Sequence, residues 1–126
     1  MTARDVKVSE TGLEVLKALW QRGPGTVREI NVALGRRGRK WAYTTVQTML
    51  NRLAAKGLVE CDKSQVPHRY RAAVTREALL KERLDHLADE LCEGTATPLV
   101  LALVEGGQFS AEELEQFRKL LDRLEE

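Results

Sequence analysis

Residues 41–58 read WAYTTVQTMLNRLAAKGL, and this stretch decides the fold. Its apolar residues recur at i, i+3, i+4 and i+7, the spacing of an amphipathic helix: Val46, Met49, Leu50 and Leu53. The opposite face carries hydroxyl and amide side chains at Thr44, Gln47, Thr48 and Asn51. Such groups hydrogen-bond to base edges and phosphates in a major groove. The pattern therefore predicts a helix that docks on a core and contacts DNA with its outer face.

The predicted helix also lacks acidic residues. No Asp or Glu occurs between Val46 and Leu58, so nothing there would repel a phosphate backbone. Gly57 is expected to end the helix in the left-handed conformation.

Two helices are predicted before this stretch. The first runs from about Ser9 to Arg22, with Ser9 as N-cap, and Gly23-Pro24-Gly25 stops it. The second begins at Thr26-Val27-Arg28-Glu29, which has the Thr-x-x-Glu form of a capping box. The basic loop Gly35–Lys40 follows and is predicted to be flexible. A helix, a turn and an amphipathic helix in this order predict a helix-turn-helix.

A β-hairpin is predicted after Gly57. Residues 58–62 and 68–72 alternate in the manner of strands around residues 63–67. Arg69 and Arg71 flank Tyr70, so one strand face is basic while the other packs on the core. This is what a wing beside a recognition helix requires. His68 has two open interpretations, a phosphate contact or a solvated strand end.

The net charge of +1 conceals a strong segregation of charge. Residues 22–76 hold twelve basic and three acidic side chains, whereas residues 77–126 hold five basic and thirteen acidic ones. A block of like charge is often only a solvated face. Because the basic block coincides with a helix free of acid, we favour a polyanionic partner for it, with the acidic tail facing away.

Three further helices are predicted in the acidic tail. Thr75 caps the first, Thr97-Pro98 opens the second, and Ser110–Glu113 is a capping box for the third. Their leucine-rich seams resemble the a and d positions of paired helices. About fifty residues cannot bury three such seams, so association with a second copy is expected, the alternative being that the helices fold back on the amino-terminal domain. The predicted dimerisation residues are Leu80, Leu84, Leu87, Leu91, Leu99, Leu103, Leu114, Phe117, Leu121 and Leu124.

Several classes of protein are disfavoured by composition. Cys61 and Cys92 lack ligand neighbours at metal spacing, so no metal site, cofactor or disulfide framework is predicted, and the thiols are expected to be buried or idle. The longest apolar run, Leu99–Val104, is too short for a membrane span, and no leader opens the chain, so a cytoplasmic protein without membrane insertion is expected. His68 and His86 have no catalytic partners in the pattern, so an enzyme is not expected.

The chain resembles the BlaI/MecI/CopY family of winged-helix repressors over nearly its whole length. The resemblance rests on Trp41–Thr48, Leu50-Asn51-Arg52-Leu53, Lys56-Gly57-Leu58-Val59 and His68-Arg69-Tyr70. It implies a winged-helix DNA-binding domain at residues 1–74 and a helical dimerisation domain at residues 75–126, with a palindromic operator bound by a homodimer. It implies base and phosphate contacts at Tyr43, Thr44, Thr45, Gln47, Thr48 and Arg52, to which the helical face adds Asn51.

The resemblance also concerns induction. Relatives that control β-lactam resistance are cut by a membrane sensor protease at an Asn-Phe bond in the apolar helix, where this chain has Ala102-Leu103. Copper-responsive relatives carry clustered cysteines near the end, and here none follows Cys92.

The sequence thus predicts a mainly helical winged-helix repressor of double-stranded operator DNA. Further phosphate contacts are expected from Arg28, Arg36, Arg37, Arg39, Lys40, Arg69 and Arg71. The alternative is a winged-helix module that binds proteins, since one fold hosts several functions.

Overall fold

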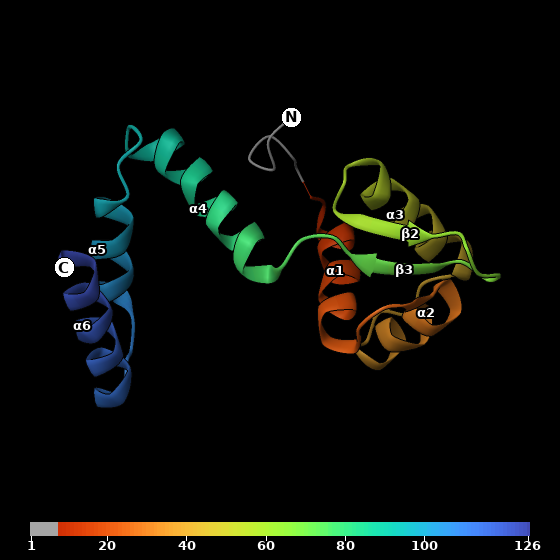
Figure 1. Ribbon diagram of the computed structural model, residues 1–126, viewed down its shortest axis with the longest axis horizontal. Helices are drawn as coiled ribbons and strands as arrows, with labels where there is room; N and C mark the ends of the chain where they lie inside the picture. Colours follow the sequence, from red (N-terminus) through yellow and green to blue (C-terminus); the bar gives the residue numbers. More distant parts are fainter. Residues whose placement is uncertain (1–7) are drawn as a thin grey trace. The chain divides into compact units, whose positions relative to one another are not determined.

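A computed structural model describes residues 8–126 and divides the chain into two compact units, with the division between Arg83 and Leu84. The first unit holds the helices α1 (Glu10–Arg22), α2 (Val27–Arg36) and α3 (Tyr43–Ala55) and a small sheet (Figure 1). The strands are β1 (Gly25–Thr26), β2 (Val59–Asp62) and β3 (Arg69–Ala72). Helix α4 (Arg76–Leu91) crosses the division, and α5 (Thr97–Gly106) and α6 (Ala111–Glu125) belong to the second unit.

The predicted helix limits are confirmed by their caps. Ser9 Oγ accepts a hydrogen bond from Gly12 N at 3.0 Å at the start of α1. Thr26 and Glu29 form the predicted capping box of α2. Gly57, with φ +78°, follows α3 in the left-handed region, where a glycine has no Cβ to clash.

The core of the first unit lies between the three helices and the sheet. It contains Leu16 of α1, Ile30 and Leu34 of α2, and Val46 and Leu50 of α3, all fully buried. The predicted apolar seam of α3 therefore docks as expected, with Met49 at its margin.

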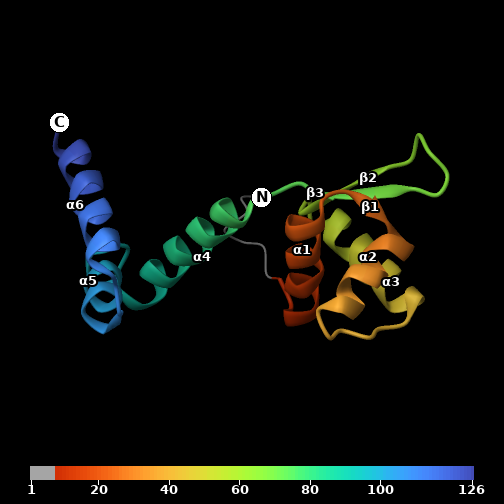
Figure 2. The same ribbon diagram turned by 90° about the horizontal axis from the view of Figure 1, so that it is seen from below.

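The predicted two-stranded hairpin proves to be part of a three-stranded antiparallel sheet with the order β1-β3-β2. Gly25 pairs with Tyr70 and Thr26 with Arg69, so the short link between α1 and α2 becomes an edge strand. Tyr70 is buried, as the alternation predicted. The β2–β3 hairpin extends beyond the helices as a wing (Figure 2). Together these elements make a winged helix-turn-helix.

The start of α4 belongs to the first unit. Trp20 Nε1 donates to the carbonyl oxygen of Val74 at 2.8 Å, and Leu79 is buried in the core. The first compact unit therefore extends past residue 74, and the functional boundary after residue 74 stays a prediction.

In the second unit, α5 and α6 lie side by side in both views (Figures 1 and 2). Phe109 and Phe117 contact edge to face, with ring centroids 5.0 Å apart. Ser110 and Glu113 form the predicted capping box of α6. No described side chain of α5 or α6 is buried in the single chain.

Candidate nucleic-acid interface

The outer face of α3 is exposed to solvent. Thr44, Thr45, Gln47 and Thr48 are exposed, while Val46 and Leu50 between them anchor the helix in the core. Thr48 Oγ1 donates to the carbonyl oxygen of Thr44 at 2.9 Å, which leaves its lone pairs to accept. The predicted contact residues Tyr43, Asn51 and Arg52 are also exposed on this helix.

The amino-terminal end of α3 offers unsatisfied donors. The N-cap residue is Ala42, whose methyl side chain cannot form a capping hydrogen bond. No acidic residue lies in the first turn of α3. The first N–H groups of a helix have no intrahelical acceptor and carry a partial positive charge. This end of α3 is therefore suited to donate hydrogen bonds to a phosphate oxygen.

Asn51 connects α3 to the wing. Its Oδ1 accepts a hydrogen bond from the Tyr70 hydroxyl at 3.3 Å, which leaves the amide nitrogen as its free donor. Burial raises the pKa of the Tyr70 phenol, so the hydroxyl keeps its proton and donates. The sequence indicated Asn51 as a contact but not this fixed orientation.

The predicted phosphate contacts fall into two groups. Arg28, Arg36, Lys40 and Arg52 are exposed and form no ion pair with residues 8–126. Arg37, Arg39, Arg69 and Arg71 instead contact protein carboxylates. The second group is therefore partly neutralised.

The basic loop before α3 is anchored on α1. Arg37 donates to Gln21 Oε1 at 2.7 Å and lies 3.9 Å from Glu14 Oε2, and Arg39 Nε lies 3.7 Å from the same carboxylate oxygen. At the other end, Asn31 Nδ2 donates to the carbonyl oxygen of Trp41 at 2.9 Å. The loop thus holds the entry to α3 in place.

A cluster around Glu29 joins three parts of the first unit. Arg22 Nη2 lies 2.9 Å and Arg69 Nη1 lies 3.3 Å from Glu29, which also accepts from Thr26 N at 2.9 Å. The Thr26 N–H bond, followed by the charges of Arg22 and Arg69, lowers the pKa of Glu29. The sequence indicated Glu29 only as a cap, because its ion pairs with Arg22 of α1 and Arg69 of β3 depend on how these elements pack.

The wing carries both signs of charge. Arg71 Nε donates to Glu60 Oε2 at 2.9 Å across the paired register of β2 and β3. Beyond them, the Ser64 hydroxyl and N–H donate to Asp62, and these bonds lower the pKa of Asp62. Val66 at the wing tip is 93% exposed.

Other kinds of site find no support in the described part of the chain. Residues 8–126 contain no cluster of three or more His, Cys, Asp or Glu side chains able to hold a metal ion. Cys61 and Cys92 are free and half-buried. Within the same residues, no helix is long and apolar enough to cross a membrane.

Comparison with known families identifies the family to which this chain belongs. The model of the penicillinase repressor family matches residues 8–123. The chain belongs to the penicillinase repressor family. This confirms the resemblance seen in the sequence, and membership of the family indicates a DNA-binding transcriptional repressor.

Individual relatives agree. The chain is 34% identical to the transcriptional regulator BlaI of Mycobacterium tuberculosis, over 98% of this chain and 88% of that protein. It is 26% identical to the penicillinase repressor of Bacillus licheniformis, over 92% of this chain and 90% of that protein. These relatives are transcriptional regulators, which confirms the prediction that the chain is not an enzyme.

Among solved structures, a MarR family protein from Bacillus stearothermophilus is 22% identical and gives a TM-score of 0.46. The match covers 96% of this chain and 75% of that chain.

Proposed function

We propose that this member of the family represses transcription by inserting α3 into the major groove of a palindromic operator, as a homodimer. The observation that carries the proposal is the outer face of α3. It exposes hydroxyl and amide groups without a carboxylate, and the core fixes its orientation. Base reading is assigned to the side chains at the centre of that face, Thr44, Gln47, Thr48 and Asn51.

Phosphate contacts are assigned around α3. Arg28, Arg36, Lys40 and Arg52 form the principal set, because no described carboxylate competes for them. Arg37, Arg39, Arg69 and Arg71 form a secondary set, since each must leave or share a protein carboxylate before it binds DNA. Tyr43 and Thr45 lie in the first turn of α3, where they accompany its free N–H groups.

The test separates base reading from phosphate binding. The DNA is a site selected by the full chain from a random-sequence library, and the comparison is a scrambled duplex of equal length. We expect Gln47→Ala to weaken binding to the selected site by about 1–3 kcal/mol and to leave the scrambled duplex nearly unchanged. Arg36→Ala should weaken both, since phosphates carry no sequence.

Mobility-shift titrations at one salt concentration measure these losses. Equal losses on both duplexes for Gln47→Ala would remove α3 from the role of base reader. The same titrations repeated over a series of salt concentrations give the slope of the logarithm of affinity against the logarithm of salt. A slope near zero would favour the alternative of a protein-binding module, because phosphate neutralisation requires a negative slope.

We propose that dimerisation uses the leucine seams of the carboxy-terminal helices. Leu84 and Leu87 of α4 and Leu121 and Leu124 of α6 are exposed in the single chain. Exposed apolar side chains in rows mark protein–protein contact surfaces, and a second copy offers the same surface. The other members of the predicted seam are Leu80, Leu91, Leu99, Leu103, Leu114 and Phe117.

We further propose that derepression proceeds by cleavage between Ala102 and Leu103. Both residues are exposed, and their position inside α5 means that a cut would separate α6 from the rest of the chain. A membrane sensor protease is the proposed agent, and the cytoplasm, where the operator lies, is the proposed location. Mass spectrometry of the chain recovered from β-lactam-treated cells would detect a fragment that ends at Ala102, and intact chain alone would contradict cleavage.

A further inference from the structure

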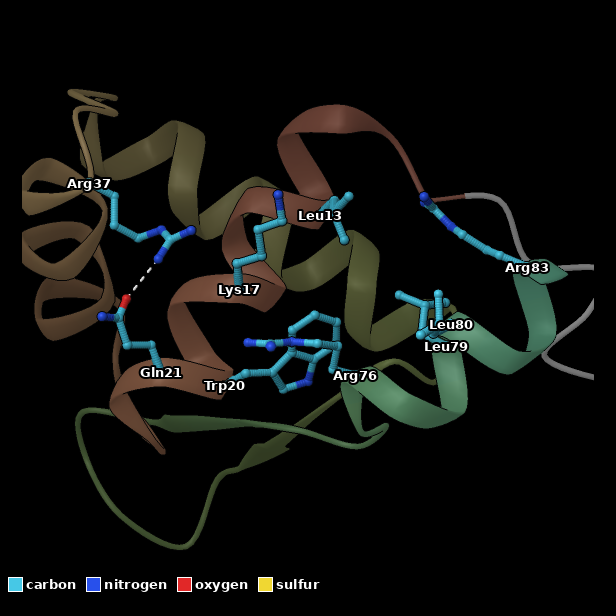
Figure 3. A pocket seen from close by; sticks show the side chains of 9 residues that line it. All are labelled: Leu13, Lys17, Trp20, Gln21, Arg37, Arg76, Leu79, Leu80 and Arg83. Carbon is cyan, nitrogen blue, oxygen red and sulfur yellow. Dashed lines mark hydrogen bonds between the residues drawn. The ribbon is translucent and has the colours of Figure 1, made fainter. Parts of the chain in front are cut away.

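A hollow of about 560 Å³ lies between α1 and the first turns of α4, entirely within the first unit (Figure 3). We name it the α1–α4 pocket. Its apolar lining comes from Leu13, Trp20, Leu79 and Leu80. Its volume falls within the range of small-molecule sites in proteins, which are mostly apolar with a few convergent polar groups.

None of the residues that line the pocket is acidic. Four of them are cationic, namely Lys17, Arg37, Arg76 and Arg83. Glu14 stands just outside, 3.4 Å from Lys17 Nζ and 3.9 Å from Arg37 Nε. Arg76 and Arg83 form no ion pair with a carboxylate among residues 8–126. The pocket therefore keeps an excess of positive charge, which attracts an anion.

Trp20 defines the body of a suitable ligand. Its indole N–H is satisfied by the Val74 carbonyl oxygen at 2.8 Å, so the ring is fixed in place. The Arg76 guanidinium lies over the ring at 5.9 Å from its centroid, so the indole face already interacts with a cation at the edge of the pocket. A flat apolar ring that carries a carboxylate matches both the indole and the cations.

The DNA-binding surface does not account for these groups. Lys17 projects from α1 and Arg76 and Arg83 from α4, whereas the proposed DNA contacts lie on α2, the loop after it, α3 and the wing. Arg37 is the one residue that both sets share. Its hydrogen bond to Gln21 directs it toward α1, as Figure 3 shows.

We propose that the α1–α4 pocket binds a small aromatic carboxylate and acts as an effector site. The ring lies against Trp20 and Leu79, and the carboxylate is held by Lys17 and Arg83. Its negative charge competes with Glu14 and Gln21 for Arg37, which belongs to the loop that anchors the entry to α3. The effect on DNA rests on the proposed function, whereas binding to the pocket does not.

The binding test uses the full chain without DNA and 1-naphthoate as the probe. The chain has two tryptophans, so its two indole N–H signals are resolved by nuclear magnetic resonance and assigned with Trp41→Phe. We expect 1-naphthoate to shift the Trp20 signal with a dissociation constant of about 1 mM, as a fragment-sized ligand should. The uncharged 1-naphthamide and inorganic phosphate should each bind at least about tenfold more weakly, because each lacks one half of the recognition.

The matched variants are Lys17→Gln/Arg83→Gln and, as a control that also removes two positive charges, Arg118→Gln/Lys119→Gln on α6. Arg118 and Lys119 lie outside the lining of the pocket, so their loss should leave the affinity unchanged. The Lys17→Gln/Arg83→Gln variant should weaken 1-naphthoate binding about tenfold or more while the unfolding midpoint stays near that of the control. No shift of the Trp20 signal at 20 mM 1-naphthoate, or equal affinity in both variants, would overturn the proposal.

Two further outcomes are distinguishable. A Trp20 signal that moves with protein concentration and ignores 1-naphthoate would mean that a second copy of the chain covers the pocket, and this also overturns the proposal. With the selected operator, 1-naphthoate should change the affinity of the wild type about fivefold or more and that of the Lys17→Gln/Arg83→Gln variant much less. Pocket binding without any effect on DNA would overturn the effector role alone, and operator binding itself would still test the proposed function.

Discussion

Glu29 shows how much one carboxylate can organise. It caps α2 through the Thr26 N–H, and its oxygens also receive Arg22 from the end of α1 and Arg69 from β3. This half-buried side chain therefore adds a link between the wing strand and the helix-turn-helix to the pairing of β1 with β3.

We expect Glu29→Gln to change how stability depends on pH. Glutamine preserves the capping box, so the variant isolates the loss of charge. The pKa of Glu29 in the folded chain lies below its ordinary value of 4.5. A carboxyl group whose pKa is lowered by folding stabilises the folded chain fully above its unfolded pKa. This stabilisation is lost as the pH falls through the folded pKa.

Urea unfolding at a series of pH values measures the difference. The wild type should be the more stable protein at neutral pH, and the difference should shrink as the pH falls below about 4.5. A difference that stays constant from neutral to strongly acid pH would contradict the role of the charge.

Glu60 is predicted to restrain the wing. Its carboxylate engages Arg71, so Glu60→Gln should release that arginine and remove a charge that repels phosphate. We expect tighter binding to scrambled DNA and a salt slope steeper by up to about one unit, measured by filter binding across salt. Glu125→Gln makes the same change of charge at the end of α6 and should have little effect; similar gains in both variants would indicate net charge alone.

At the scale of elements, two glycines with open surroundings should respond oppositely to alanine. Gly57 follows α3 and has φ +78°, whereas Gly35 lies inside α2 and is not left-handed. At both positions an added Cβ would meet no atom within 4 Å. Gly57→Ala should destabilise by roughly 1 kcal/mol, while Gly35→Ala should stabilise by about 0.5–1 kcal/mol. Urea unfolding checks both signs, and destabilisation by Gly35→Ala would show that α2 needs glycine there.

The elements of this chain differ in how visible they are in the sequence. Helices α1 and α2 were predictable from their local caps at Ser9 and Thr26, and α3 from the spacing of its apolar residues. Strand β1 was not, because two residues have no periodicity and its partner β3 lies more than forty residues away.

The same distinction applies to the candidate site. The exposed face of α3 follows from helical spacing. The carboxylate partners of four of the predicted phosphate contacts depend on how the elements pack: Arg37, Arg39, Arg69 and Arg71. The sequence pattern therefore predicted the same phosphate-binding role for all the basic residues.

At the scale of the whole molecule, we predict that Leu121→Glu converts a dimer into monomers. Leu121 is 59% exposed in the single chain, so a carboxylate there need not unfold a protomer. Gln116→Glu introduces the same charge on α6 and should leave the dimer intact. Sedimentation equilibrium measures both, and an unchanged dimer in Leu121→Glu would remove α6 from the interface.

The exposed leucine seams also have a consequence for gene dosage. If only a second copy covers them, the amount of dimer at low concentration rises with the square of the protomer concentration. When the protomer concentration is well below the dissociation constant of the dimer, halving the number of chains in a cell would then lower the amount of dimer to about a quarter. Control of the regulated genes would respond more steeply to synthesis and degradation of this chain than a monomeric repressor would allow.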